Sequence, residues 1–277
     1  MFLAAHPQGA RGRGRPAATV IGVPYDATAS FRRGARFAPA AIRWASQSIE
    51  SYSPVLDRDL EEVAVVDIGD LPVEHLPAEA MIDEVVRAVG AAAGLPVVLG
   101  GVHTVTAGAV RALAARHPAL RALILDAHLD LHEEYEGTRW SHASTTCRLM
   151  ESVRKDRIAL LGVRAGTREE FAAGRGLLAA ERRLAVDRTL WSQLEGHPVY
   201  LSVDIDVVDP SAAPGTGNPE PGGPAAEELL DLLRILAPLR VVGVDVVEVA
   251  PPYDASGRTA VLAATLLREA LLAWGAA

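Results

Sequence analysis

The sequence lacks the features that mark disulfide-bonded, membrane-spanning or secreted proteins. Its 277 residues include a single cysteine, Cys147, so no disulfide can form within the chain. No run approaches the roughly 18 uninterrupted apolar residues that a membrane-spanning helix needs. The first 18 residues are rich in Gly and Arg and hold no apolar segment of the secretory-signal type. We therefore expect a cytoplasmic protein with a flexible N-terminal segment over 1–18.

Positive charge is also scarce. The 27 Lys and Arg residues face 35 Asp and Glu residues, which gives a formal net charge of −8. This balance provides no basic surface for nucleic acid or for an anionic membrane, and it favours cationic or neutral partners. Hydrophobic residues make up 49% of the chain and charged residues 22%, a composition typical of a globular protein with a large core. We expect one domain over 19–277.

Short apolar runs rich in Val, Ile and Leu alternate with longer segments rich in Ala, Leu and Arg. The predicted strands lie at 19–23, 63–70, 96–101, 121–130, 157–164, 198–209 and 240–249. The predicted helices lie at 78–93, 106–115, 225–236 and 259–274. Because the strands are apolar throughout, both faces of their sheet should be covered, which indicates an α/β fold with a parallel sheet. Ligands of such sheets bind beyond the carboxyl ends of the strands.

Two of these strand ends carry side chains that bind metal ions. Asp126, His128 and Asp130 occupy every second position, so in an extended chain they would project to the same side. Asp204 and Asp206 repeat this spacing after another apolar run. Two buried acids on one strand face repel each other unless a cation neutralises them. The pattern therefore predicts a cation at this edge of the sheet.

A third strand end adds His103, which follows the pair Gly100-Gly101. Glycines at this point permit a tight turn and a close approach of two backbone segments. The combined set holds two imidazoles, four carboxylates and no thiolate, a composition that suits Mn²⁺ better than Zn²⁺. Because six ligands exceed what one ion needs, we predict two Mn²⁺ ions.

Four separated segments together resemble a known family. GGVH at 100–103, DAHLD at 126–130, SVDIDVVDPSAAPGTGNPEPGG at 202–223 and VDVVEVAPPYD at 244–254 are similar to the signature segments of the ureohydrolases, which include arginase and agmatinase. The resemblance covers nearly the whole chain after about residue 18. It implies an arginase-like three-layer α/β/α sandwich with a mostly parallel sheet, two Mn²⁺ per subunit and a homo-oligomer, commonly a trimer or hexamer. It also implies hydrolysis of a guanidino group to urea and an amine.

The resemblance also suggests how the metal ligands divide their work. His103 and His128 would each bind one ion, Asp126 and Asp206 would bridge the ions, and Asp130 and Asp204 would complete the two ligand sets. A hydroxide shared by the ions would attack the guanidinium carbon, because two cations lower the pKa of a water molecule from about 15.7 towards neutrality. Asp130 would also direct that hydroxide.

The same resemblance suggests residues that handle the substrate. Glu248 would grip the guanidinium through charge-assisted hydrogen bonds, and His142 would contact the substrate and supply the leaving amine with a proton. His132 competes for that role because it lies nearer the metal-binding segment. Two residues depart from the family pattern. Val102 replaces an acid that usually precedes the first metal-binding histidine, and Asn218 replaces a threonine near the guanidinium pocket.

The choice of substrate depends on the segment after the metal ligands, LHEEYEGTRWSH at 131–142. It has three acids, Glu133, Glu134 and Glu136, where arginases have residues that hold a carboxylate. Acids suit a substrate with a second cation and no carboxylate, so agmatine, hydrolysed to putrescine and urea, is the predicted substrate. The alternatives are arginine, guanidinobutyrate or guanidinopropionate, a deacetylase-like enzyme with one zinc ion, and a metal-binding relative that has lost activity.

Overall fold

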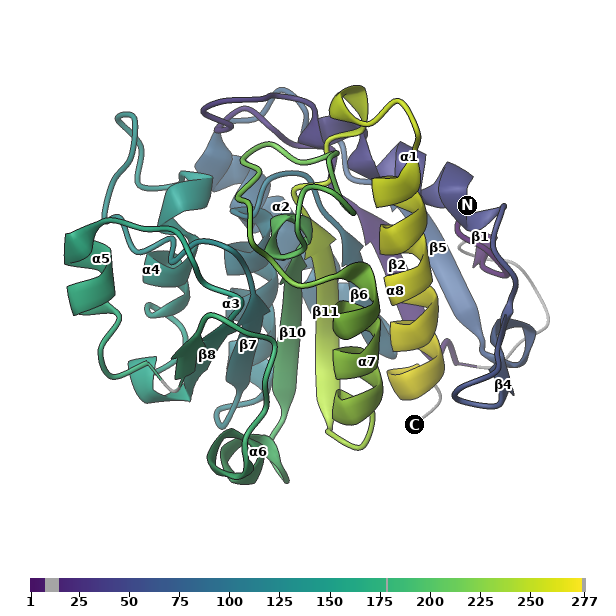
Figure 1. Ribbon diagram of the computed structural model, residues 1–277. Coiled ribbons are helices and arrows are strands. Elements are labelled where there is room, and N and C mark those ends of the chain that lie inside the picture. The colour runs from purple at the N-terminus through teal and green to yellow at the C-terminus, as the bar shows by residue number, and fades with distance from the viewer. Residues whose placement is uncertain (8–14, 178, 276–277) are drawn as a thin grey trace.

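The computed structural model describes residues 1–7, 15–177 and 179–275. Within them, nine strands form one sheet in the order β1-β5-β2-β6-β11-β10-β7-β8-β9, and every neighbouring pair is parallel (Figure 1). The strands are β1 (His6–Pro7), β2 (Ala18–Gly22), β5 (Val65–Asp70), β6 (Leu95–Leu99), β7 (Arg121–Leu125), β8 (Ile158–Leu161), β9 (Ala179–Glu181), β10 (Val199–Asp204) and β11 (Val241–Val247). A separate antiparallel pair joins β3 (Tyr52–Ser53) to β4 (Arg58–Asp59).

Helices cover both faces of this sheet, which makes a three-layer α/β/α sandwich. On one face α8 contacts α1 and α7, and on the other α3 contacts α2 and α4 (Figure 1). The helices are α1 (Ala38–Ser46), α2 (Ala78–Ala91), α3 (Val105–Arg116), α4 (Thr145–Leu149), α5 (Arg168–Ala173), α6 (Arg188–Leu194), α7 (Ala226–Leu236) and α8 (Arg258–Trp274). Among the described residues, none of the helices combines the length and the apolar character that crossing a bilayer requires.

The core consists of two hydrophobic clusters, one on each side of the sheet. Successive side chains of a strand point to opposite faces, so Leu123 and Leu125 of β7 join one cluster while Ala122 and Ile124 join the other. All residues of β6 and β10 are buried. The uninterrupted apolar runs of the sequence therefore belong to central strands covered on both sides, as predicted.

The seven predicted strands and four predicted helices are confirmed as elements, but two predicted strands end early. The run at 121–130 leaves the sheet after Leu125, and the run at 198–209 leaves it after Asp204. The sequence analysis missed β1, β9 and four helices, α1, α4, α5 and α6. These elements are short, with at most nine residues each, so hydrophobic periodicity has few positions on which to act.

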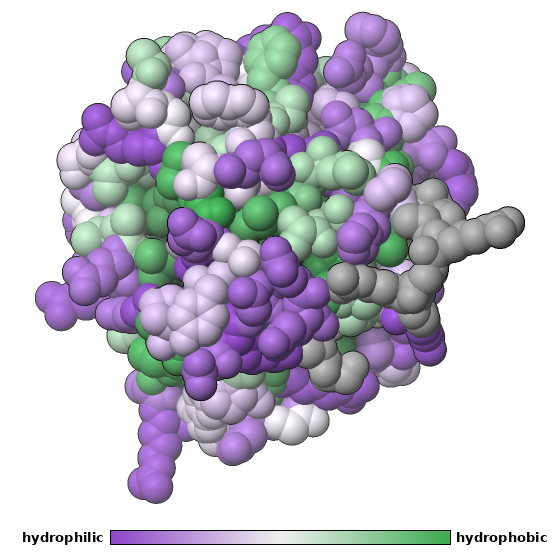
Figure 2. Space-filling model, turned by 90° about the vertical axis from the view of Figure 1, so that its right-hand side faces the viewer, coloured by the Kyte–Doolittle hydropathy of each residue, from purple (hydrophilic) through white to green (hydrophobic). Residues whose placement is uncertain are grey.

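The start of the chain belongs to the fold, whereas we expected a flexible segment over 1–18. Phe2 is buried, and its backbone N–H donates to Oδ2 of Asp67 over 2.8 Å. His6–Pro7 adds β1 to the edge of the sheet beside β5. Residues 8–14, which the same expectation included, lie outside the described residues. Figure 2 shows this side of the molecule, where hydrophobic residues lie interspersed among hydrophilic ones.

Candidate metal centre and active site

The predicted ligands meet beyond the carboxyl ends of four adjacent central strands, β6, β11, β10 and β7. A cavity of about 370 Å³ opens at this edge. The predicted site residues that line it are His103, His128, Asp130, His142, Asp204, Asp206, Asn218 and Glu248. Asp126 is almost completely buried beside them. The parallel topology thus gathers residues that are up to 145 positions apart in the sequence.

His103 follows β6 after a turn that depends on glycine. A Cβ atom at Gly101 would lie 1.9 Å from the carbonyl oxygen of Tyr25, so no other residue fits there without a backbone shift. The His103 side chain is completely buried. Its backbone N–H donates to Oε1 of Glu248 over 2.7 Å, which joins the ends of β6 and β11.

The segment after β7 brings three predicted ligands to the cavity, but not as an extended strand. Oδ1 of Asp126 accepts the backbone N–H of His128 over 2.6 Å, and Asp130 has a left-handed backbone with φ of 51°. The expectation that Asp126, His128 and Asp130 project to one side through strand alternation was therefore wrong in its geometry. They converge because side-chain to backbone hydrogen bonds and a left-handed residue bend the segment.

The second pair of acids behaves in the same way. Asp204 is the last residue of β10, whereas Asp206 lies in a 3₁₀ turn, Ile205–Val207. Oδ1 of Asp204 accepts the backbone N–H of Asp206 over 2.9 Å. Alternation along a strand does not place this pair. A short polar turn brings both carboxylates to the cavity.

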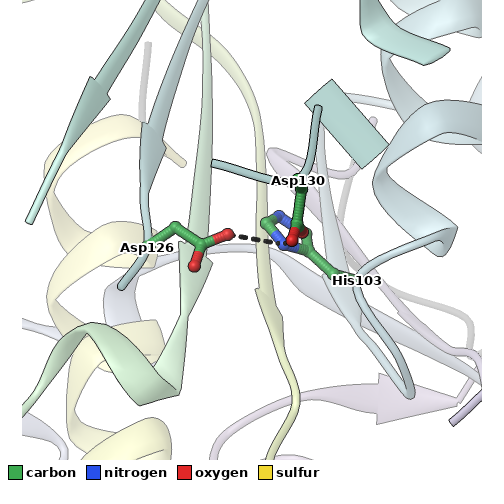
Figure 3. A group of neighbouring side chains, drawn as sticks. All are labelled: His103, Asp126 and Asp130. Atoms are coloured by element: carbon green, nitrogen blue, oxygen red, sulfur yellow. Dashed lines mark ion pairs between the residues drawn. The ribbon is translucent and has the colours of Figure 1, made fainter. Parts of the chain in front are cut away.

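The side chains form two groups that share one carboxylate, as each group gathers a histidine with two aspartates. His103 lies with Asp126 and Asp130, and His128 lies with Asp126 and Asp206. Nδ1 of His103 is 3.0 Å from Oδ2 of Asp126, the contact that Figure 3 shows. Nδ1 of His128 is 3.5 Å from the other oxygen of the same carboxylate. Asp126 therefore lies between the two histidines, where a bridging ligand belongs.

The other expected bridge, Asp206, lies beside one histidine only. Its Oδ2 is 3.0 Å from Nδ1 of His128, while its Oδ1 accepts the backbone N–H of Ala127 over 3.2 Å. With one oxygen engaged by the backbone, Asp206 is placed to serve a single ion. Asp204 approaches the first group, with Oδ2 3.3 Å from Nδ1 of His103.

The pKa values of the acids show that burial and neighbouring negative charges disfavour their ionised forms. Burial and the charge of Asp206 raise the pKa of Asp204 well above its ordinary value. Burial and the charge of Asp126 raise the pKa of Asp130 to about 6, and burial raises that of Glu248 to about 7. Each raised pKa means that the ionised form is disfavoured in this surrounding. Bound cations would remove this penalty.

The donor atoms also fit metal ions. Nδ1 of His103 and Oδ2 of Asp126 are buried and make no hydrogen bond, although they face each other across 3.0 Å. Buried polar atoms without partners are rare, because each costs about 1–3 kcal/mol. A cation between a nitrogen lone pair and a carboxylate oxygen would satisfy both. The carboxylate-rich donor set matches hard divalent ions such as Mn²⁺.

His142 also lines the cavity, where it contacts the loop that precedes α1. Its Nδ1 is 3.0 Å from the carbonyl oxygen of Thr28, and its Nε2 is 3.3 Å from both Oγ of Ser30 and Nδ2 of Asn218. A carbonyl oxygen can only accept, so Nδ1 carries a proton and donates to Thr28. The sequence analysis missed Thr28 and Ser30.

Glu248 follows β11 with a left-handed backbone, φ 61°, and lines the cavity with only 5% of its surface exposed. Such a conformation costs a non-glycine residue on the order of 1 kcal/mol or more. This left-handed conformation directs the side chain to the cavity. Glu248 therefore presents a carboxylate beside the predicted metal ligands.

The three acids of the segment 131–142 do not line the cavity, although His132, Tyr135 and His142 of the same segment do. This part of the substrate argument was wrong. Glu134 and Glu136 are exposed, and exposed Glu133 pairs with Arg148 across 2.8 Å. The cavity instead receives the carboxylate of Glu170, from α5, with its Oε2 3.3 Å from Nε2 of His132. Glu170 stands three residues after Thr167, a spacing that predicts a helix cap and gives no sign of the cavity, so the sequence could not have identified this second role.

Comparison with known proteins settles the family. The family model described as "Arginase family" matches residues 16–273. The chain belongs to the arginase family. Its members include relatives named agmatinase, among them that of Bacillus anthracis, which is 40% identical over 99% of this chain and 96% of that relative. The sequence resemblance is thereby confirmed, and this arginase-family chain is a hydrolase acting on guanidino compounds.

Two further relatives show how the family varies around this fold. The guanidinobutyrase of Pseudomonas aeruginosa is 35% identical over 92% of this chain and 85% of that relative. The solved structure of proclavaminate amidino hydrolase from Streptomyces clavuligerus is 33% identical, covers 99% of this chain and 96% of its own, and superposes with a TM-score of 0.87. The three-layer fold of this arginase-family chain is therefore shared with relatives that bear different names.

Proposed function

We propose that this hydrolase converts agmatine to putrescine and urea with two Mn²⁺ ions per subunit. The observation that carries the proposal is that the two oxygens of Asp126 face His103 and His128, each within a separate ligand group. One carboxylate between two imidazoles is the arrangement that a two-ion site requires. The agmatinase relatives support agmatine as the substrate.

The six ligands proposed to hold the ions are His103, Asp126, His128, Asp130, Asp204 and Asp206. Two divalent ions held by these residues would lower the pKa of a water molecule towards neutrality and so would supply a nucleophile at neutral pH. A site with one zinc ion would leave half of these ligands idle, which argues against the deacetylase-like alternative. Asp130, which lines the cavity, is proposed to direct the nucleophile by accepting a hydrogen bond.

Two cavity residues are proposed to act on the substrate directly. Glu248 would bind the planar guanidinium through charge-assisted hydrogen bonds. When protonated on both nitrogens, His142 would give the Nε2 proton to the leaving amine, while its Nδ1 proton stays in the hydrogen bond to the carbonyl oxygen of Thr28. In the neutral ring Nε2 is an acceptor, and the NH₂ group of Asn218, 3.3 Å away, would donate to it and so orient the ring. His132 is the weaker candidate for the acid, since its Nε2 faces the carboxylate of Glu170.

The charges around the cavity favour a substrate with a second cation. Among the described residues that line it there is no Lys or Arg, whereas Glu170 adds a carboxylate beyond the metal ligands and Glu248. An ammonium group, as in agmatine, would be attracted to this wall. The carboxylate of guanidinobutyrate or arginine would meet like charge with no partner. Guanidinobutyrate remains the second candidate because a guanidinobutyrase is among the relatives.

Urea release tests the proposed substrate. Protein loaded with Mn²⁺ is given agmatine, 4-guanidinobutyrate, 3-guanidinopropionate and arginine in parallel, with chelator-treated protein as control. We expect kcat/KM for agmatine to exceed that for each guanidino acid at least tenfold, about 1.4 kcal/mol in transition-state binding. A preference for any of the acids would overturn the argument from the cavity charges, and urea from chelated protein would overturn the metal dependence.

A variant of the cavity wall tests the same argument from the protein side. Glu170→Gln removes the charge but keeps the size and one acceptor oxygen, so the helix cap that it forms with Thr167 is partly retained. We expect KM for agmatine to rise about tenfold with kcat nearly unchanged, because the lost contact acts on ground state and transition state alike. The exposed neighbour Glu169→Gln is the matched control. Equal KM values in the two variants would remove Glu170 from substrate recognition.

The cellular location and the subunit number are proposed from the sequence alone. We propose a cytoplasmic location, consistent with a single cysteine, and a homo-oligomer, with a trimer or a hexamer as the expected forms. Light scattering of the purified protein gives the subunit number directly.

A further inference from the structure

A buried group of polar side chains lies behind His103, and the proposed reaction does not use it. Asp245 of β11 is completely buried and accepts three hydrogen bonds. Tyr200 and Thr106 donate their hydroxyls to its Oδ2 over 2.6 and 2.7 Å. Ser202 donates to its Oδ1 over 2.6 Å. Three donors on one carboxylate match its ionised form, which has only acceptors to offer.

Ser202 passes the influence of this carboxylate to the metal ligand. Its Oγ lies 3.1 Å from Nε2 of His103. A serine hydroxyl has one proton, and Ser202 uses it in the hydrogen bond that it donates to Asp245. Towards the histidine, the serine oxygen can therefore only accept, so Nε2 of His103 must carry a proton.

The tautomer of His103 follows from this arrangement. A neutral imidazole with a proton on Nε2 has its lone pair on Nδ1. Nδ1 is the atom that makes no hydrogen bond and faces Asp126, Asp130 and Asp204 at 3.0, 3.3 and 3.3 Å. The lone pair thus points at the place where the first ion would bind.

We propose that Asp245 is a positioning residue that acts through Ser202 to hold His103 in the tautomer and orientation that bind metal. The proposal rests on the metal centre of the proposed function, but not on the identity of the substrate. Val102, which departs from the family pattern, is buried among apolar side chains and offers no carboxylate. Asp245 offers one through Ser202, on the Nε2 side of the imidazole ring. Carboxylates behind metal-binding histidines fix the ring in the same sense elsewhere.

Asp245→Asn is the direct test because it reverses the chain of donors. Tyr200 and Thr106 both need the acceptor that Oδ2 provides, so the amide NH₂ faces Ser202. The serine oxygen then accepts from the amide, and its proton turns towards Nε2 of His103. Nε2 then accepts this hydrogen bond with its lone pair, so the proton of the neutral ring lies on Nδ1 instead.

Metal binding is measured on metal-free protein titrated with Mn²⁺ alone, with the free ion counted by electron paramagnetic resonance. We expect Asp245→Asn to lower the affinity for one of the two Mn²⁺ ions by about 10- to 100-fold, the usual effect of losing a residue that supports a metal ligand. Ser202→Ala, which removes the link itself, should weaken the same ion. Tyr200→Phe is the matched control, because it removes a hydrogen bond to the same carboxylate and leaves the link intact.

Nitrogen-15 NMR of histidine-labelled, metal-free protein reads the tautomer independently. The aspartates that face Nδ1 raise the pKa of His103, so the spectra are recorded at a pH above that pKa, where the ring carries one proton. We expect a protonated Nε2 at His103 in the parent and in Tyr200→Phe, and a protonated Nδ1 in Asp245→Asn. Unchanged tautomer and affinity in a folded Asp245→Asn protein, or an equal loss in Tyr200→Phe, would overturn the proposal. A parent protein that binds no Mn²⁺ would overturn the proposed metal centre and this positioning role with it. Two bound ions in the parent with unchanged affinity in Asp245→Asn would overturn the positioning role alone.

Discussion

Asp126→Asn is expected to lower kcat for urea release by about 10³-fold or more and to leave fewer than two Mn²⁺ ions per subunit. Loss of the metal contribution is worth several kcal/mol, and each 1.36 kcal/mol is about tenfold in rate. Asp126 is singled out because it belongs to both ligand groups. Every other aspartate in those groups belongs to one. A single substitution here should therefore disturb both ions.

The geometry of Asp126 explains why an isosteric amide is not enough. Oδ1 accepts the backbone N–H of His128 over 2.6 Å and lies 3.5 Å from Nδ1 of the same residue, and Oδ2 faces Nδ1 of His103 over 3.0 Å. Asparagine can keep only one of these oxygens. Its NH₂ would point either at a backbone donor or at an imidazole lone pair where a cation belongs, so one group loses a ligand in either orientation.

The measurement is metal content by mass spectrometry together with urea release on the same sample. Asp231→Asn, on the exposed side of α7, is the control for the loss of one negative charge at a distance. A variant at Asp126 that bound two ions and released urea as fast as the parent would falsify the proposed site. Retention of two ions with lost activity would instead assign Asp126 to the reaction rather than to binding.

The sequence predicted which residues meet, and it did so through topology. Each predicted ligand follows an apolar run, and the carboxyl ends of parallel strands lie at one edge, so His103, Asp126 and Asp204 had to come together once the sheet was parallel. The spacing of alternate residues was a weaker guide. Asp130 and Asp206 reach the cavity through a left-handed residue and a 3₁₀ turn, which a pattern of types does not encode.

The supporting residues could not be predicted, because their roles depend on contacts between distant segments. In the sequence, Asp245 is a single polar residue within an apolar strand, and no pattern marks Ser30 as a functional residue. Only the packing of β11 against β10 brings Asp245 to Ser202, and only the fold brings Ser30 within 3.3 Å of His142, 112 positions away. Glu133, Glu134 and Glu136 show the opposite error. Their number suggested contact with the substrate, but they are exposed and do not line the cavity.

Glu248→Gln is expected to lower kcat/KM for agmatine between about 30- and 1000-fold while both Mn²⁺ ions stay bound. A hydrogen bond to a charged partner contributes about 1.5–3 kcal/mol, and a carboxylate can make two to a guanidinium. Glutamine keeps one acceptor and the volume of the side chain. It also pays the same backbone cost at φ 61°, so the comparison isolates the charge.

The unchanged metal content separates this effect from that of Asp126→Asn. Oε1 of Glu248 accepts the backbone N–H of His103 over 2.7 Å, and the amide oxygen of glutamine can take over that bond. The remaining NH₂ group then faces the cavity as a donor, where the guanidinium also offers only donors. Repulsion between donors should therefore add to the lost attraction. A glutamine variant with parental kcat/KM would mean that the guanidinium is held elsewhere in the cavity, whereas loss of metal would mean that Glu248 supports His103 rather than the substrate.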